Sequence, residues 1–348
     1  MDRVVTQQTP PIDVPAAHPL AGQPGRDANK VEGSEFDPAT GDRTPPQRHT
    51  RGLWQGKQTT MTTTIDTRIV RTAPGMEFDV SVAGHPGRPL VLMLHGFCVS
   101  RHYWESQAVA LAEAGYFAAA PNQRGYASGA RPDPAEHANY KIDVLIGDAM
   151  AIVAGLGHGE RRIHLAGHDW GGSLSWNIAD RWPERLGSLT MLSRPHPLAF
   201  NRAMREDPEQ PTRSAHHKWL LEPAAEDKLL ADDAHWVRTR LRRNGVPEAA
   251  IEKHISVLGN RPAMAAAIGW YRARGTGHAP LRPTRVPTLL IWGDADDTVG
   301  RMAAEGTAEF IAAPYTFAPL AGVGHYAADQ VPDQVNDLML AHLARHPV

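Results

Sequence analysis

The residues "AGHDWGG" (166–172) place a carboxylate between glycines, in a setting that can expose a reactive side chain. An apolar run ends just before Asp169 and a helical pattern begins just after it. We therefore expect a tight strand-to-helix turn that lifts this side chain above the sheet edge. An aspartate is ionised at pH 7, since its reference pKa is about 3.9, so it can attack an electrophilic sp³ carbon directly and form an ester. The alternative is that Asp169 only caps the helix.

A second stretch, "LMLHGF", ends an apolar run in a His-Gly pair. Such an ending leaves the backbone N–H of Phe97 free to point into a site. Together with the N–H of Trp170, it would form an oxyanion hole for a reaction at Asp169.

Two further strand ends carry acidic and basic groups. "LLIWGDADD" places Asp294, Asp296 and Asp297 after one apolar run, and "LAGVGHYA" places His325 after the next. The order nucleophile, acid, histidine is typical of a catalytic triad. Each piece has an alternative: the acids could form a polar loop or a helix N-cap, and His325, one of 18 histidines, could lie on the surface. Their coincidence in order at successive strand ends favours the triad.

The elements that must position these residues can be read from residue 67 onward. Short apolar runs such as "PLVLMLHG", "RIHLAG" and "TLLIWG" alternate with helical periods such as "YKIDVLIGDAMAIVAGLG". This alternation predicts an α/β fold, a mostly parallel sheet with helices on both faces. Residues 199–283 interrupt it with helix formers and few strand signals. We expect a helical cap there, over the carboxyl ends of the strands, and a core formed by residues 61–198 and 284–348.

Residues 1–60 are rich in Pro, Gly, Asp, Gln and Thr and show no hydrophobic period. Such a segment cannot bury enough apolar surface to offset its ordering entropy, so we expect a disordered tail. The alternative is an over-extended reading frame, with Met61 as the true start.

The composition of the chain limits the classes of binding partner that we expect. The formal charge of the 348 residues is −2, which gives no electrostatic reason to expect nucleic acid or an anionic membrane. We expect the basic cluster Arg238 to Arg243 to be a solvated helix face.

Cys98 is the only cysteine, which favours a reducing, cytoplasmic location. The chain has no HExxH spacing and no GxGxxG after a strand, so we expect no metal and no cofactor. The oligomeric state stays open, with a homodimer as one option.

From about residue 67 to 348 the chain resembles the α/β-hydrolase fold, and within it the epoxide hydrolase and haloalkane dehalogenase branch. The stretches that carry this resemblance are "LHGF" with "YWESQ", "PNQRGYASGARP", "AGHDWGGSLSWNIADRWPERL", "SRPHPLAF", "GWYRARG", "IWGDADDTVG" and "GVGHYAADQVP". The family motif "WG" plus two residues plus aspartate selects Asp296 as the acid that orients His325. Asp294 is the fallback, and Asp297 is expected to be a loop residue or cap.

The resemblance also implies a substrate class. Opening an epoxide creates an alkoxide that needs a proton, and Tyr271 of "GWYRARG" matches the cap tyrosine that supplies it in epoxide hydrolases. The alternative is that Tyr271 only packs inside the cap. Dehalogenases of this branch often have an asparagine after the His-Gly pair as a halide donor. Phe97 stands there in this chain, which favours the epoxide.

The chain departs from the family in two places. Trp219 of "HHKWLLEP" stands nearest to the position of a second cap tyrosine, and an indole N–H can donate a hydrogen bond but does not readily transfer a proton. Cys98 replaces a proline after "HGF" and makes the turn less constrained. We expect hydrolysis of a small apolar epoxide by water. The alternatives are hydrolysis of a haloalkane or another C–X bond by the same triad, and a non-catalytic hydrolase fold that binds a ligand.

Overall fold

The computed structural model describes residues 63–274 and 281–348. The predictions of a disordered tail over residues 1–60 and of a start at Met61 lie outside these residues.

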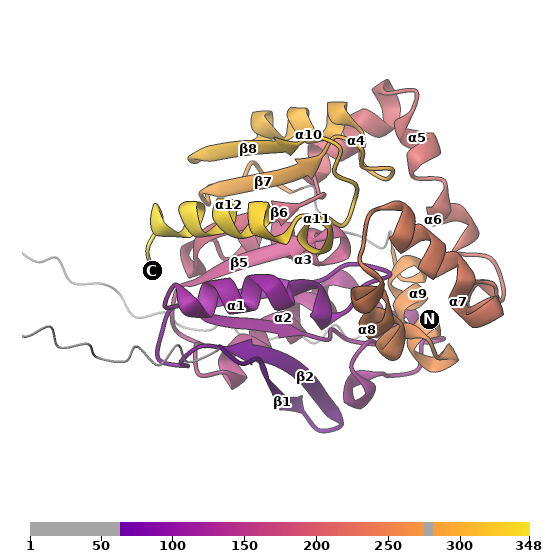
Figure 1. The fold of residues 1–348 in the computed structure, drawn as a ribbon, viewed down its shortest axis with the longest axis horizontal. Helices are drawn as coiled ribbons and strands as arrows, with labels where there is room; N and C mark the ends of the chain where they lie inside the picture. The colour runs from indigo at the N-terminus through magenta and orange to yellow at the C-terminus, as the bar shows by residue number, and fades with distance from the viewer. Residues whose placement is uncertain (1–62, 275–280) are drawn as a thin grey trace, which may run out of the picture. The chain divides into compact units, whose positions relative to one another are not determined.

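One sheet organises the described part of the chain (Figure 1). Its strands follow one another in the order β1-β2-β4-β3-β5-β6-β7-β8. The first two strands form an antiparallel hairpin, β2 pairs with β4 in antiparallel fashion, and every other neighbouring pair is parallel. The strands are β1 (Asp66–Ala73), β2 (Met76–Ala83), β3 (Leu90–Leu94), β4 (Phe117–Pro121), β5 (Ile163–His168), β6 (Leu186–Leu192), β7 (Thr288–Gly293) and β8 (Tyr315–Leu320).

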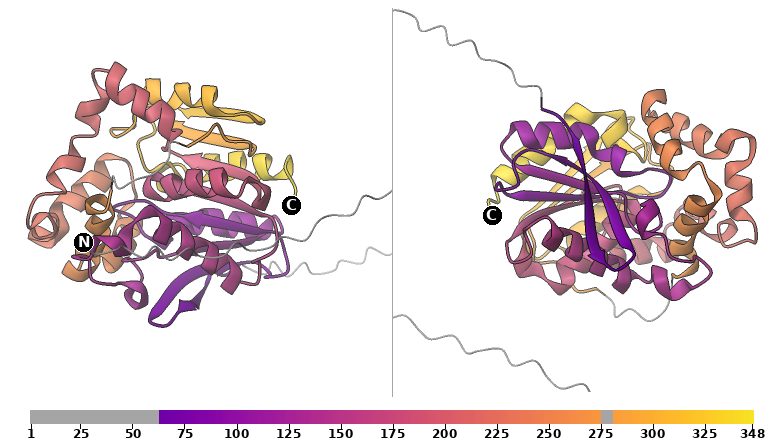
Figure 2. Two further views of the ribbon diagram at one scale, coloured as in Figure 1. Left: turned by 180° about the vertical axis from the view of Figure 1, so that it is seen from behind. Right: turned by 90° about the horizontal axis from the view of Figure 1, so that it is seen from below.

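The central strands are continuous apolar runs because both of their faces are covered. Every residue of β3, β5, β6 and β7 is buried, as expected for parallel strands between two helical layers. Helices α1 and α12 cover one face, and α2 and α3 cover the other (Figures 1 and 2). The predicted α/β architecture is therefore confirmed. These helices and two further ones are α1 (Glu105–Glu113), α2 (Ile142–Gly155), α3 (Asp169–Arg181), α10 (Arg301–Gly306), α11 (Ala327–Gln330) and α12 (Pro332–Ala344).

A group of helices between β6 and β7 lies at one end of the sheet (Figure 1). The first, α4, packs against α10, whereas α7, α8 and α9 pack on one another. Helix α7 is interrupted by non-helical backbone at residues 231–234. The predicted cap boundaries, 199 and 283, remain a prediction. The helices are α4 (Pro197–Glu206), α5 (Gln210–Arg213), α6 (His216–Trp219), α7 (Ala225–Arg243), α8 (Glu248–Leu258) and α9 (Arg261–Arg272).

Short 3₁₀ helices occupy several of the connections: η1 (Arg101–Trp104), η2 (Ser128–Ala130), η3 (His137–Tyr140), η4 (Pro183–Arg185) and η5 (Thr307–Phe310). Among the residues that the structure describes, no helix combines the length and the apolar character needed to cross a membrane.

Candidate active site

Asp169 lies in a sharp turn between β5 and α3. Its φ of +48° is in the left-handed region, which non-glycine residues rarely adopt. The turn is possible because its neighbours are glycines: a Cβ at Gly171 would lie 2.2 Å from the carbonyl oxygen of Leu94, and one at Gly167 would lie 2.4 Å from Oγ of Ser175. The turn exposes 13% of the Asp169 side chain at the edge of the sheet.

The loop after β3 contacts the carboxylate of Asp169. The backbone N–H of Phe97 donates a 3.0 Å hydrogen bond to Oδ1 of Asp169. The approach requires glycine at position 96, because a Cβ there would lie 2.5 Å from Cβ of Asp169. Of the two N–H groups predicted to face the site, that of Phe97 is the one that bonds to Asp169 within the described residues.

His325, in the loop after β8, lies between two carboxylates. Its Nδ1 is 2.9 Å and 3.0 Å from the two carboxylate oxygens of Asp296, and its Nε2 is 4.0 Å from Oδ2 of Asp169. Both His325 and Asp296 are buried. Asp296 also accepts hydrogen bonds from the backbone N–H groups of Thr298 and Val299. The imidazole is therefore oriented through Nδ1, with Nε2 directed at Asp169.

Asp294 and Asp297, the other two acids of "GDADD", bond to residues other than His325. Asp294 accepts a 2.7 Å hydrogen bond from the backbone N–H of Gly322. Asp297 pairs with Arg240 of α7 at 3.2 Å. The structure thus brings Asp169, His325 and Asp296 together and gives each of the other two acids a separate contact.

Charges around the site set the ionisation of its groups. Burial alone would raise the pKa of Asp169, but His325, His168 and Arg194 and the Phe97 N–H hold it below its usual range. Burial lowers the pKa of His325, yet the charge and hydrogen bond of Asp296, together with Asp169, raise it above the ordinary value. Asp169 is therefore an ionised carboxylate next to a comparatively basic imidazole.

Tyr271 approaches the site from helix α9. Its ring centroid lies 5.3 Å from that of Phe97 and 5.1 Å from that of Trp170, and its side chain is buried. Burial and the charge of Asp169 raise its pKa well above the ordinary value. The hydroxyl therefore keeps its proton at neutral pH.

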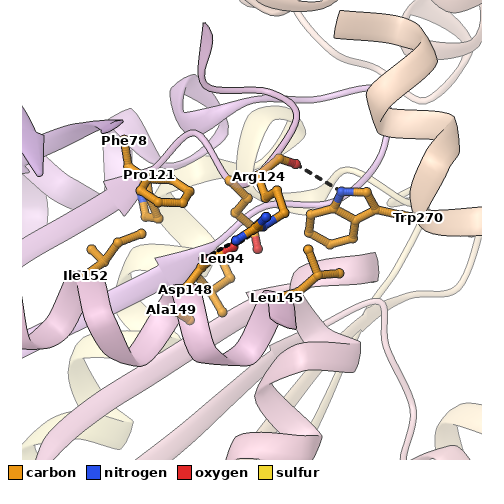
Figure 3. A pocket seen from close by; sticks show the side chains of 10 residues that line it. Phe78, Leu94, Pro121, Arg124, Leu145, Asp148, Ala149, Ile152 and Trp270 are labelled. Atoms are coloured by element: carbon orange, nitrogen blue, oxygen red, sulfur yellow. Dashed lines mark hydrogen bonds and ion pairs between the residues drawn. The ribbon is translucent and has the colours of Figure 1, made fainter. Parts of the chain in front are cut away.

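The preceding residue fixes α9 to the core. The indole N–H of Trp270 donates a 3.0 Å hydrogen bond to the backbone carbonyl of Arg124, and the Arg124 guanidinium is held by both carboxylate oxygens of Asp148 (Figure 3). The space beside these residues measures about 10 Å³, no more than a water molecule needs. This contact positions Tyr271 and does not form a ligand site.

Trp219 lies against a residue of α7. Its ring centroid is 5.1 Å from that of Trp236 of α7. The aromatic neighbour of Tyr271 from α6 is instead His217, at 5.5 Å. Sequence reasoning did not single out His217, although it lies two residues before Trp219 in the same motif.

The basic segment of α7 is only partly solvated. Arg238 pairs with Glu252, and Arg242 with Glu248. Arg240 points inward, is 17% exposed, and bonds to Asp297. The expectation of a solvated face was wrong for Arg238, whose side chain is 11% exposed, and for Arg240, which the helix turns toward the loop after β7.

A cavity of about 260 Å³ lies beside Trp170, between the start of α3 and residues 194–201 and 270–274 of the connection between β6 and β7. Aromatic side chains and two arginines line it, among them Trp170, Phe200, Trp270, Arg194 and Arg274. In residues 63–274 and 281–348, no cluster of three His, Cys, Asp or Glu side chains is arranged to hold a metal ion.

The comparisons with known proteins agree with this arrangement. The family model described as alpha/beta hydrolase fold matches residues 89–330. Over 281 residues the chain is 30% identical to epoxide hydrolase 4 of Mus musculus, covering 77% of each protein. It is also 30% identical to epoxide hydrolase A of Mycobacterium tuberculosis, covering 79% of this chain and 96% of that protein.

A solved structure titled as one of the novel epoxide hydrolases in metagenomes from hot environments superposes with a TM-score of 0.71. It is 26% identical and covers 81% of this chain and 100% of its own. The chain therefore belongs to the α/β-hydrolase family. Within it, the chain is an epoxide hydrolase-like enzyme.

Proposed function

We propose that the protein hydrolyses an epoxide with an apolar body to a vicinal diol, in two steps through an ester on Asp169. The observation that carries this proposal is the ionised carboxylate of Asp169 with Oδ2 4.0 Å from a histidine that Asp296 orients. Hydrolases with a serine nucleophile need their histidine to activate that serine. A carboxylate needs no such activation, so the histidine is available for water.

In the first step, Oδ2 of Asp169 attacks one ring carbon of the epoxide. The bond between that carbon and the ring oxygen breaks, and the oxygen takes the proton of the Tyr271 hydroxyl. The raised pKa of Tyr271 supports this assignment, because it keeps the proton on the hydroxyl until an alkoxide, a stronger base, develops beside it.

In the second step, His325 takes a proton from water through Nε2, and the resulting hydroxide adds to Cγ of Asp169. The negative charge that develops on Oδ1 is stabilised by the N–H of Phe97, with the N–H of Trp170 as the second donor. Collapse breaks the ester bond, and the proton of the added hydroxyl passes to the leaving alkoxide, which releases the diol and leaves Asp169 as a carboxylate. The proton on His325 returns to the Tyr271 oxygen. The net reaction is epoxide plus water to diol.

The test is turnover of a panel of epoxides and haloalkanes, followed by diol and halide release. A single turnover in ¹⁸O-water should label Asp169, since the water oxygen enters its carboxylate. Halide release without diol formation would support the haloalkane alternative with the same residues. The absence of both products and of the label would leave the non-catalytic alternative. The cytoplasmic location remains a prediction from the single cysteine, Cys98.

A further inference from the structure

Two guanidinium groups share the cavity beside the nucleophile. Arg194 follows β6, and Arg274 follows α9, so the core and the cap each contribute one. Burial and the neighbouring Arg274 lower the pKa of Arg194 to about 10. The two positive charges are therefore close enough to repel each other.

Neither cation forms an ion pair within the described residues, although the negative charge of Asp169 acts on Arg194. No carboxylate lies within 4.0 Å of Arg194 or Arg274 in that part of the chain, and Nε of Arg194 is buried without a hydrogen-bond partner there. By contrast, Arg124 pairs with Asp148, Arg240 with Asp297, and Arg272 with Glu226. Arg194 is half-buried with a buried, unpaired Nε, which is costly, whereas Arg274 is exposed. An anion in this cavity would be stabilised by both cations.

The positive charge at this cavity lies on Arg194 and Arg274, because the neighbouring His217 is neutral. His217 accepts a 2.9 Å hydrogen bond from Arg274 through Nδ1, and burial together with neighbouring cations lowers its pKa to about 3. It is therefore neutral and holds Arg274 in place. The Arg274 guanidinium carbon lies 5.5 Å from the centre of the Trp170 ring. Trp170 is the residue that follows Asp169 in the chain.

We propose that the substrate carries a carboxylate, which Arg194 and Arg274 bind while the epoxide ring lies at Asp169. The pair would offer several N–H donors to one carboxylate and would offset the repulsion between that group and the nucleophile. Trp170, Trp270 and Phe200 line the cavity for the apolar part of the molecule. This inference rests on the proposed function and narrows its substrate to epoxides that carry a carboxylate.

The test compares a short ω-epoxyalkanoic acid with its primary amide, which keeps the carbon chain and loses the charge. We expect kcat/KM to be about 10²-fold higher for the acid, the size of an effect from hydrogen bonds to a charged group. Arg194→Gln and Arg274→Gln should each reduce this preference about 10-fold, mainly through KM of the acid, and Arg194→Lys should retain part of it. Arg301→Gln, at an exposed ion pair with Glu305, is the matched control and should leave the preference unchanged.

Calorimetric binding of the saturated acid of the same length separates this inference from the proposed function, because it needs no turnover. Equal turnover of acid and amide, unchanged in the arginine variants, would overturn the carboxylate site and leave epoxide hydrolysis standing. Binding of the saturated acid to the wild type but not to Arg274→Gln, without turnover of either epoxide, would support the carboxylate site and contradict the proposed function. No binding and no turnover would overturn both.

Discussion

The backbone N–H of Phe97 donates a 3.0 Å hydrogen bond to Oδ1 of Asp169, which leaves Oδ2 as the oxygen that faces His325. The two carboxylate oxygens therefore have different tasks in the proposed reaction. Oδ1 is held where negative charge develops during ester hydrolysis, and Oδ2 is available to attack carbon.

The two-step reaction predicts different outcomes for Asp169→Asn and His325→Gln. Asp169→Asn should lower kcat by at least ~10⁴-fold, because the nucleophile is lost. His325→Gln should also stop turnover but still permit the first step, so the ester accumulates. Intact-mass spectrometry should then show His325→Gln heavier by the mass of one epoxide and Asp169→Asn unchanged. An unmodified His325→Gln protein after incubation would contradict the order of the two steps.

The acids after β7 give a matched pair of variants. Asp296→Asn should reduce kcat by ~10²- to 10⁴-fold, since the imidazole loses the carboxylate that fixes its tautomer. Asp294→Asn should stay within about twofold of the wild type, because an amide oxygen can still accept the hydrogen bond from Gly322. Steady-state diol formation measures both. Similar losses in the two variants would reject Asp296 as the orienting acid.

Tyr271→Phe removes the proposed proton donor and preserves the packed ring. We expect ring opening to slow by ~10²-fold or more, the usual contribution of a positioned acid, with single-turnover alkylation as the readout. Tyr315→Phe is the control, because that buried hydroxyl has no hydrogen-bond partner in the described part of the chain. Full epoxide activity in Tyr271→Phe would show that this residue only packs in the cap.

The pH dependence follows from His325. As a base it must be neutral, so kcat should fall as pH decreases through its pKa, which Asp296 and Asp169 raise in the free enzyme despite burial. Esterification removes the charge of Asp169, so the limb seen in kcat should lie at lower pH than the pKa of His325 titrated by NMR in the free enzyme. Alkylation of His325→Gln should show no such limb. An acid limb of the same position in that variant would assign it to another group.

A site residue could be predicted from the sequence where one short motif contains both that residue and the strand that positions it. Asp169 directly follows the buried strand β5, and His325 lies in the loop after β8. The carboxyl ends of parallel strands lie at one edge of the sheet, so chain order predicts that both residues reach that edge. The continuous apolar runs predicted β3, β5 and β7 for the same reason: each is buried on both faces.

The arrangement of the helices between β6 and β7 could not be predicted to the same depth. Its helices are placed by contacts between distant segments, and a helical period does not say what each face meets. Arg240 was expected in solvent and instead reaches Asp297. Arg194 and Arg274 are far apart in the sequence, and only the docking of α9, through Trp270 and Arg124, brings them to one cavity.

The glycines of the nucleophile turn predict a stability effect. Gly171→Ala would place a Cβ 2.2 Å from the carbonyl oxygen of Leu94, which is backbone and cannot rotate away. We expect the free energy of unfolding to fall by about 2–3 kcal/mol, as for other overpacked sites. Gly147→Ala is the matched control, because a Cβ added at this exposed helical glycine would have no neighbouring atom within 4 Å, and alanine should raise the free energy of unfolding by about 0.5–1 kcal/mol. Urea unfolding followed by circular dichroism measures both changes. An equal stability of Gly171→Ala and the wild type would mean that the turn can relax, and would weaken the link between these glycines and the position of Asp169.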